Sequence, residues 1–254
     1  MACLAPHITL SEAVVTSITF TLLYVSSLHL PFNSGDRNRR PVILSRLVTL
    51  SILATFLELY TRRRIPALTD KISSGTRLPA LAVAAALTLL LYAGHLIATP
   101  RRALLQPASR DRYIALRNYL AGPVLEEVVF RRQTLLIWSC QGVTMSLLFP
   151  AAMFSLAHVH HVRELGLVGL LLQMAYTFLF GIYAAALYIN TRTFCAPFVA
   201  HVICNLLELP DFSSIAAHPR RRGVMALYCA ALVVFAFAFG PLTTLVQPYQ
   251  LETE

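Results

Sequence analysis

Residues 123–131 read Pro-Val-Leu-Glu-Glu-Val-Val-Phe-Arg, so two adjacent carboxylates and an arginine stand among side chains that suit the interior of a membrane. An ionisable side chain at the centre of a bilayer costs about 2.5 to 3.5 kcal/mol even on the most lenient insertion scale, and a cluster of them is by default a functional site. The cluster of Glu126, Glu127 and Arg131 therefore predicts chemistry inside a membrane.

The composition of the chain indicates a membrane protein. Hydrophobic residues make up 57% of the 254 residues and charged residues only 13%, whereas soluble domains are about 45 to 50% apolar. A helix needs about 20 apolar residues to cross a bilayer. The apolar stretches cover about residues 8–30, 42–60, 78–98, 122–138, 143–159, 165–190, 194–209 and 224–247. We expect an all-α, polytopic membrane helix bundle of about eight helices with an intramembrane catalytic cavity, forming one domain over 1–254 with a catalytic core at 110–210.

The formal charge of +9 comes almost wholly from arginines that stand in blocks between the apolar stretches. Such blocks contact lipid headgroups at the ends of membrane spans. They do not form a single basic stripe with interleaved aromatics, which nucleic-acid binding favours. We therefore expect contact with membrane lipids and no nucleic-acid partner. The five cysteines are odd in number and include no CxxC pair, so they predict neither a disulfide framework nor a thiolate metal site.

The spacing of charged residues after Gly122 suggests a division of roles. Gly122 and Pro123 mark an expected helix start, which would set both carboxylates near a favourable helix dipole. Glu127 and Arg131 are four residues apart and share a helix face, so they are expected to form an ion pair. Glu126 lies about 100 degrees round the helix, where it is free to accept a proton from water. The alternative is a purely structural charge network.

Two further pairs of polar and aromatic residues lie one helical turn apart. Phe154 precedes His158 by four residues, and His201 precedes Asn205 by four. An imidazole N–H and a carboxamide N–H directed at one spot can hold the oxygen of a tetrahedral intermediate. Glu126, His158, His201 and Asn205 together supply a base, a partner and oxyanion donors, which is the minimum set for peptide hydrolysis by an activated water.

Residues 117–131, 154–161, 176–181 and 201–205 together resemble the type II CaaX prenyl endopeptidases, the Ras-converting enzymes within a wider family of intramembrane glutamate proteases. The resemblance depends on the order of three motifs, EExxxR, FxxxH and HxxxN, and covers about residues 110–210. It implies removal of the C-terminal aaX tripeptide from farnesylated or geranylgeranylated CaaX proteins such as Ras-like GTPases. It also implies a multi-pass protein of the endoplasmic reticulum membrane, with its chamber open to the cytosol.

The resemblance assigns roles by motif position. Glu126 would activate water with the help of His158, and no metal or other cofactor would be needed. His201 and Asn205 would stabilise the oxyanion, while Glu127 and Arg131 would organise the site. Candidates for the wall that faces the prenyl group are Phe154, Tyr176, Phe180 and Tyr183, for which ordinary helix packing is an equal explanation.

Three alternatives stay open at this point. A zinc peptidase could use Glu126, His158 and His201 as ligands, although HExxH is absent. A cysteine protease could pair Cys204 with His201, although a thiol in an apolar helix is usually inert. A non-catalytic scaffold or transporter could use the same polar cluster for packing or ion passage.

Overall fold

The fold was analysed in a computed structural model that describes residues 8–65, 78–99, 111–210 and 212–246. These residues form helices and connecting turns, without a strand among them. The helices are α1 Leu10–Leu28, α2 Arg40–Arg64, α3 Leu78–Leu91, α4 Ala93–Ala98, α6 Arg112–Leu116, α7 Gly122–Glu127, α8 Thr134–Trp138, α9 Val143–Leu156, α10 Val162–Thr191, α11 Cys195–Leu207, α12 Phe212–Ala217 and α13 Arg221–Leu245.

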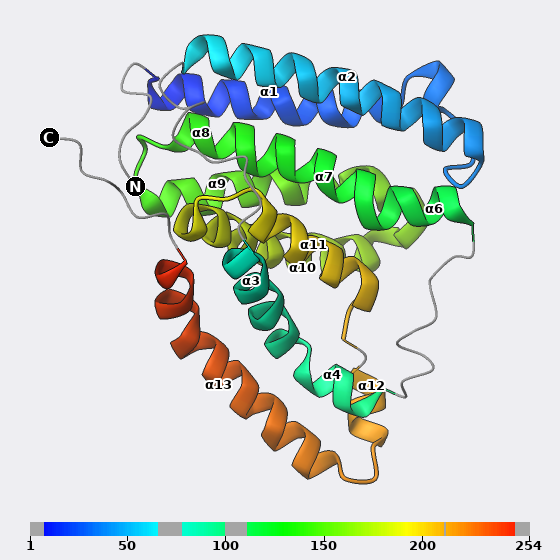
Figure 1. The fold of residues 1–254 in the computed structure, drawn as a ribbon. Coiled ribbons are helices and arrows are strands. Elements are labelled where there is room, and N and C mark those ends of the chain that lie inside the picture. The colour runs from blue at the N-terminus through cyan, green and yellow to red at the C-terminus, as the bar shows by residue number, and fades with distance from the viewer. Residues whose placement is uncertain (1–7, 66–77, 100–110, 211, 247–254) are drawn as a thin grey trace, which may run out of the picture.

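The eight apolar stretches all correspond to helical segments, which confirms the expected bundle (Figure 1). Four helical runs in the described part of the chain are long and apolar enough to cross a membrane: Leu10–Leu28, Arg40–Arg64, Val143–Thr191 and Arg221–Leu245. In Figure 1, α1 and α2 lie side by side along one edge, and α6, α7 and α8 run in line beneath them. The pair α3–α4 and the long α13 lie at the opposite edge.

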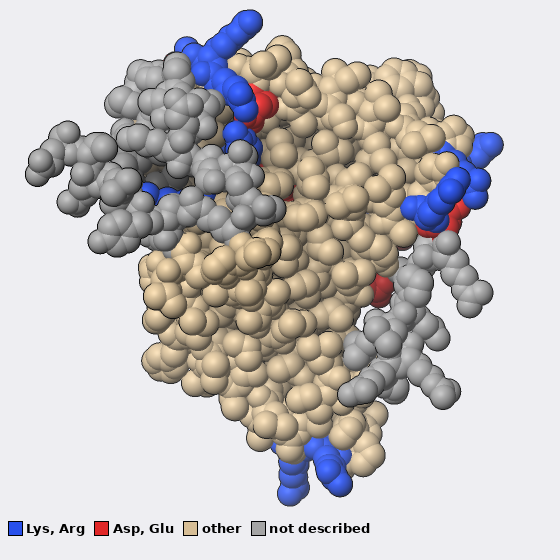
Figure 2. All heavy atoms as spheres, viewed as in Figure 1, with Lys and Arg blue, Asp and Glu red and all other residues tan. Residues whose placement is uncertain are grey.

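Large apolar side chains cover the outside of the bundle. Ile52 on α2, Leu179 on α10 and Phe237 on α13 are 65%, 66% and 79% exposed. On the face that Figure 2 shows, a broad uncharged surface lies between groups of arginines at its edges. A helix that is apolar all round suits either a large core or a membrane. Since these helices face outward, lipid is the solvent that fits them.

The segment that carries the two glutamates is one long helix with two wider turns. Asp111 caps its true start, because its carboxylate accepts the backbone N–H of Tyr113 at 2.8 Å. The helix passes through a π-helical segment at Arg117–Ala121, then α7, then a second π-helical segment at Val128–Gln133. The expected helix start at Gly122 is therefore wrong, since the preceding turn is already helical. Single π-helical turns inside α-helices are frequent at functional sites, and two of them flank Glu126 and Glu127.

The helices α9 and α10 pack closely behind that segment. A Cβ added at Gly181 would lie 2.8 Å from both the Cα and the Cβ of Ala151, so only glycine allows the two backbones to approach this closely. Gly166 takes a φ of 65° within α10, which bends the start of that helix. This packing places the Phe154–His158 turn of α9 against the glutamate helix.

In the described part of the chain, Cys195, Cys204 and Cys229 are free thiols.

Candidate functional site

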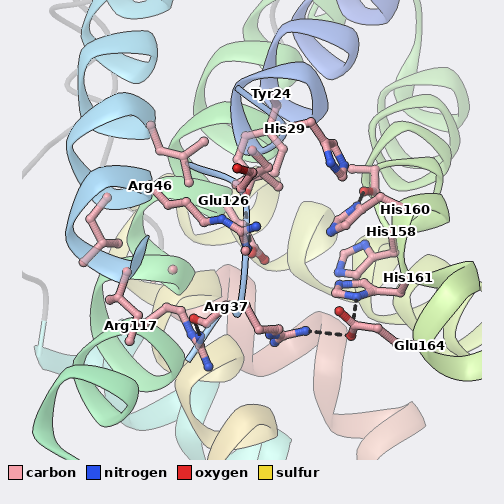
Figure 3. Close-up of a pocket in the computed structure, with 18 of the residues that line it drawn as sticks. Tyr24, His29, Arg37, Arg46, Arg117, Glu126, His158, His160, His161 and Glu164 are labelled. Carbon is pink, nitrogen blue, oxygen red and sulfur yellow. Dashed lines mark hydrogen bonds and ion pairs between the residues drawn. The ribbon is translucent and has the colours of Figure 1, made fainter. Parts of the chain in front are cut away.

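A cavity of about 490 Å³ opens between α1, α2, α7 and the turn that joins α9 to α10 (Figure 3). Apolar side chains line one part of it: Leu28, Leu47, Leu50, Phe130 and Phe154. Figure 3 shows Glu126 near the centre, with His158, His160 and His161 on one side and Arg46 and Arg117 on the other. Two of the predicted catalytic residues, Glu126 and His158, line this cavity.

Glu126 is the carboxylate that reaches the cavity. Its side chain keeps 24% of its surface exposed, whereas that of Glu127 is fully buried. The Tyr24 hydroxyl on α1 donates to Glu126 Oε1 at 3.3 Å. The other oxygen, Oε2, lies 3.6 Å from Nε2 of His201. The Tyr24 hydrogen bond fixes one oxygen of the carboxylate, while the other lies beyond hydrogen-bond distance of His201 and remains open to water from the cavity.

Glu127 lies between a histidine and an arginine. Its Oε1 is 2.7 Å from Nδ1 of His201, and its Oε2 is 3.3 Å from Nε of Arg131. The expected Glu127–Arg131 ion pair is thus present, with side-chain exposures of 0% and 1%. His201 contacts both glutamates, a contact that helical spacing did not predict.

Phe154 is the aromatic centre of the site. The Arg131 guanidinium carbon lies 4.1 Å from the centre of its ring, within the range of a cation–π contact. The rings of His158 and His201 meet it edge-on at 4.9 and 6.1 Å. Phe180 packs against the same group, 4.9 Å from the His201 ring. Phe154 is only 2% exposed, so it fixes the positions of the charged side chains around it.

The other two predicted wall residues lie apart from Glu126. Tyr176 is 36% exposed and is not one of the described residues that line the cavity. The Tyr183 hydroxyl lies 2.9 Å from the Thr88 hydroxyl on α3, which indicates a packing role between helices.

The tautomer of His158 is set by its backbone contact. Its Nδ1 lies 2.8 Å from the carbonyl oxygen of Phe154, and because a carbonyl can only accept, Nδ1 donates. The neutral ring is then left with Nε2 as an acceptor of a hydrogen bond. His158 can therefore accept a proton or a hydrogen bond from a molecule that enters the cavity.

Asn205 satisfies a carbonyl that the glutamate helix leaves without a donor. In the first π-helical segment the N–H of Gly122 bonds to the carbonyl of Arg117, and the next bond in the series would join the carbonyl of Asn118 to residue 123. Proline has no N–H, so Pro123 leaves that oxygen free. The Asn205 side chain donates to it at 2.8 Å. Its amide nitrogen carries a second N–H, although Asn205 is not one of the described residues that line the cavity.

Sequence reasoning missed two residues that line the cavity. Tyr24 lies on α1 and Arg46 on α2, in the part of the chain where no motif was found. The sequence did contain two signals. Tyr24 is an isolated tyrosine in one apolar stretch, and Arg46 is a single arginine about one and a half turns after the start of the next helix.

The alternatives can be compared with this geometry. Both ring nitrogens of His201 face glutamates, so neither is directed at the thiol of Cys204. Within the described residues no group of three or more His, Cys, Asp or Glu side chains is placed to hold a metal ion.

Comparison with known proteins links the site to a family. Residues 108–207 match the family model described as type II CAAX prenyl endopeptidase Rce1-like. Proteins called CAAX prenyl protease 2 are similar in sequence: that of Caenorhabditis elegans is 35% identical over half of this chain and 51% of its own length. The human protein is 26% identical over 94% of this chain and 84% of its own. The Arabidopsis thaliana protein is 34% identical over half of this chain and 43% of its own. The matches to the worm and plant relatives thus cover about half of their lengths, and no solved structure gives a significant match.

Proposed function

Because residues 108–207 match the family model described as type II CAAX prenyl endopeptidase Rce1-like, we propose that the chain belongs to this family and is an intramembrane endopeptidase for prenylated CaaX proteins. It removes the three C-terminal residues after a farnesylated or geranylgeranylated cysteine, with Ras-like GTPases among its substrates. The observation that carries the proposal is the orientation of Glu126, the carboxylate that reaches the cavity while the Tyr24 hydroxyl holds one of its oxygens and His201 lies 3.6 Å from the other.

The proposed reaction uses water as the nucleophile. Glu126 accepts a proton from a water molecule in the cavity, and the water oxygen attacks the carbonyl carbon that follows the prenylated cysteine. His158, with Nε2 free to accept, helps to orient the water. The peptide C–N bond then breaks, and Glu126 returns the proton to the leaving nitrogen. A general base of this kind typically contributes about 10² to 10⁴ in rate.

The remaining residues stabilise charge and hold position. His201 and the second N–H of Asn205 are assigned to the oxyanion of the tetrahedral intermediate, where one donor is typically worth about 10² to 10³ in kcat. Glu127 and Arg131 act through His201, because Glu127 holds its Nδ1 at 2.7 Å. Glu127 and Arg131 are positioning residues, since neither is one of the described residues that line the cavity.

The surroundings of Glu126 suit a substrate with a lipid tail. A prenyl chain contributes about 0.8 kcal/mol per buried CH₂ and keeps the scissile bond at the membrane. Leu28 and Leu47, both half-buried, offer apolar surface on the lining that they share with Glu126. We propose that the cavity opens to the cytosol, as the resemblance to the family implies. We propose the endoplasmic reticulum as the membrane.

We also propose that the enzyme needs no metal ion. Purified protein should then contain less than stoichiometric zinc by elemental analysis and keep its activity in a chelator. A loss of cleavage in chelator that added zinc restores would instead support ligation by Glu126, His158 and His201.

The function is tested by mass spectrometry of a farnesylated and a geranylgeranylated CaaX peptide after incubation with the purified protein. We expect release of the intact tripeptide from both, and none from the same peptide without its prenyl group. Separate Glu126→Ala and His201→Ala variants should lose this activity, and activity that survives either change rejects the role of that residue. A wild type that is inert toward all prenylated peptides would support the scaffold.

A further inference from the structure

The mouth of the cavity carries more positive than negative charge. Four arginines line it: Arg37, Arg46, Arg117 and Arg163. The acidic residues on the same lining are Asp36, Glu126 and Glu164. Arg37 pairs with Glu164 at 3.1 Å, and Glu126 accepts a hydrogen bond from Tyr24 and lies 3.6 Å from His201. The other arginines therefore face the cavity without a carboxylate partner among the described residues.

Arg117 and Arg46 differ in how their nitrogens are used. All three nitrogens of Arg117 donate within the protein, to the Asn118 side chain, the Arg37 carbonyl and the Asn38 side chain. Arg117 therefore holds the turn between α1 and α2. In Arg46 only Nε has a described partner, the carbonyl of Asn33 at 3.1 Å. Its two terminal nitrogens are free to bind a ligand, and Figure 3 shows the side chain extending from α2 into the pocket that Glu126 faces.

The height of Arg46 above Glu126 follows from the helix geometry. Arg40, the first residue of α2, pairs with Asp111, the N-cap of α6, at 3.4 Å, so the two helices start at the same level. At about 1.5 Å per residue, Arg46 lies about 9 Å and Glu126 about 22 Å inward from that level. Three extended residues span about 10 to 11 Å. A tail that starts at Glu126 and points to the mouth therefore ends near Arg46.

We propose that Arg46 binds the C-terminal carboxylate of the substrate and so determines that cleavage removes three residues. The role of Arg46 rests on the proposed function and identifies the side chain that recognises the C-terminal end of the substrate. The guanidinium fork matches a carboxylate with two parallel hydrogen bonds. Since the carboxylate is present only at the chain end, Arg46 would reject longer tails as well as tails that lack the charge.

The test compares two farnesylated CaaX peptides that differ only in ending with a free carboxylate or a carboxamide. Wild type in phosphatidylcholine vesicles should cleave the acid with a kcat/KM at least tenfold higher, mainly through a lower KM. In Arg46→Gln the two peptides should be cleaved with similar kcat/KM, and Arg46→Lys should keep part of the preference. Arg40→Gln is the matched control, because Arg40 lies on the same helix, is not one of the described residues that line the cavity, is 63% exposed and pairs with Asp111. It should keep the full preference.

Other results would distinguish the role of Arg46 from the alternatives. Equal cleavage of the two peptides by wild type, or a preference that survives Arg46→Gln, overturns the role of Arg46 while leaving the peptidase function intact. A loss in Arg46→Gln that affects both peptides equally and appears only in vesicles with anionic lipid assigns Arg46 to headgroups instead. If Arg46→Gln cleaves neither peptide, inhibition of wild type by the free tripeptide but not by its amide supports the site, and equal inhibition by both overturns it. A wild type that cleaves neither peptide overturns the proposed function itself.

Discussion

His201 Nδ1 and Glu127 Oε1 lie 2.7 Å apart, on helices separated by 74 residues in the sequence. This contact joins α11 to the glutamate helix, and Arg131 completes it from the other side of the carboxylate at 3.3 Å. The neighbouring glutamate is thereby left to face the cavity. Two adjacent residues with the same side chain therefore have different tasks, and substitutions should separate them.

Replacing Glu127 should destabilise the fold. Glu127→Gln leaves the charge of Arg131 buried without compensation, and removal of one partner from a buried ion pair costs about 3 to 5 kcal/mol. Thermal unfolding of the detergent-purified protein measures the loss. The double variant Glu127→Gln with Arg131→Gln should be less destabilised than the sum of the single changes, and simple additivity would show that the pair is not coupled.

Removing the Tyr24 hydroxyl should slow the reaction and leave the fold intact. Tyr24→Phe deletes the donor to Glu126 Oε1, and one hydrogen bond to a charged group is worth about 1.5 to 3 kcal/mol. We expect kcat/KM on a prenylated peptide to fall by about tenfold or more. Tyr60→Phe is the matched control, because Tyr60 lies at the same α1–α2 contact and packs edge-on against Phe20. Equal rates in the two variants would exclude a role for Tyr24 in orienting Glu126.

Substitutions at the hydrogen bond between Asn205 and Asn118 should distinguish an effect on stability from an effect on catalysis. Asn205→Ala leaves the Asn118 carbonyl without a donor, which costs about 1 to 3 kcal/mol if the group stays buried. Adding Pro123→Ala supplies a backbone N–H at residue 123 and should recover part of the unfolding midpoint. If Asn205 also donates to the oxyanion, the double variant stays slow on the prenylated peptide. Recovery of both midpoint and rate would limit Asn205 to a structural role.

The contact between Gly181 and Ala151 should tolerate no added methyl group. Gly181→Ala puts a Cβ at 2.8 Å from two atoms of Ala151, and overpacking of this kind costs about 1 to 3 kcal/mol. Gly240→Ala in α13 is the control, since nothing lies within 4 Å of its added Cβ. The unfolding midpoint should fall only in the first variant, and a similar midpoint in both would show that α9 can shift freely.

The sequence was sufficient to predict the helices and the pairing within each one. Apolar length predicted the eight helical segments, and four-residue spacing predicted the Glu127–Arg131 pair. Spacing could not predict which helices meet, because that depends on close contacts such as Gly181 against Ala151. The contacts of His201 with both glutamates, of Tyr24 with Glu126 and of Asn205 with Asn118 are all of this kind. The π-helical turns were also hidden, although Pro123 was a signal that one carbonyl would need another donor.

The central claim is that Glu126 is the base that activates water. Glu126→Gln keeps the size of the side chain and its contact with Tyr24 but removes the charge that accepts a proton. Mass spectrometry of tripeptide release from a prenylated CaaX peptide should show a rate at least about 10² lower in this variant, with an unfolding midpoint close to that of wild type. Cleavage by Glu126→Gln at a rate similar to wild type would contradict the account.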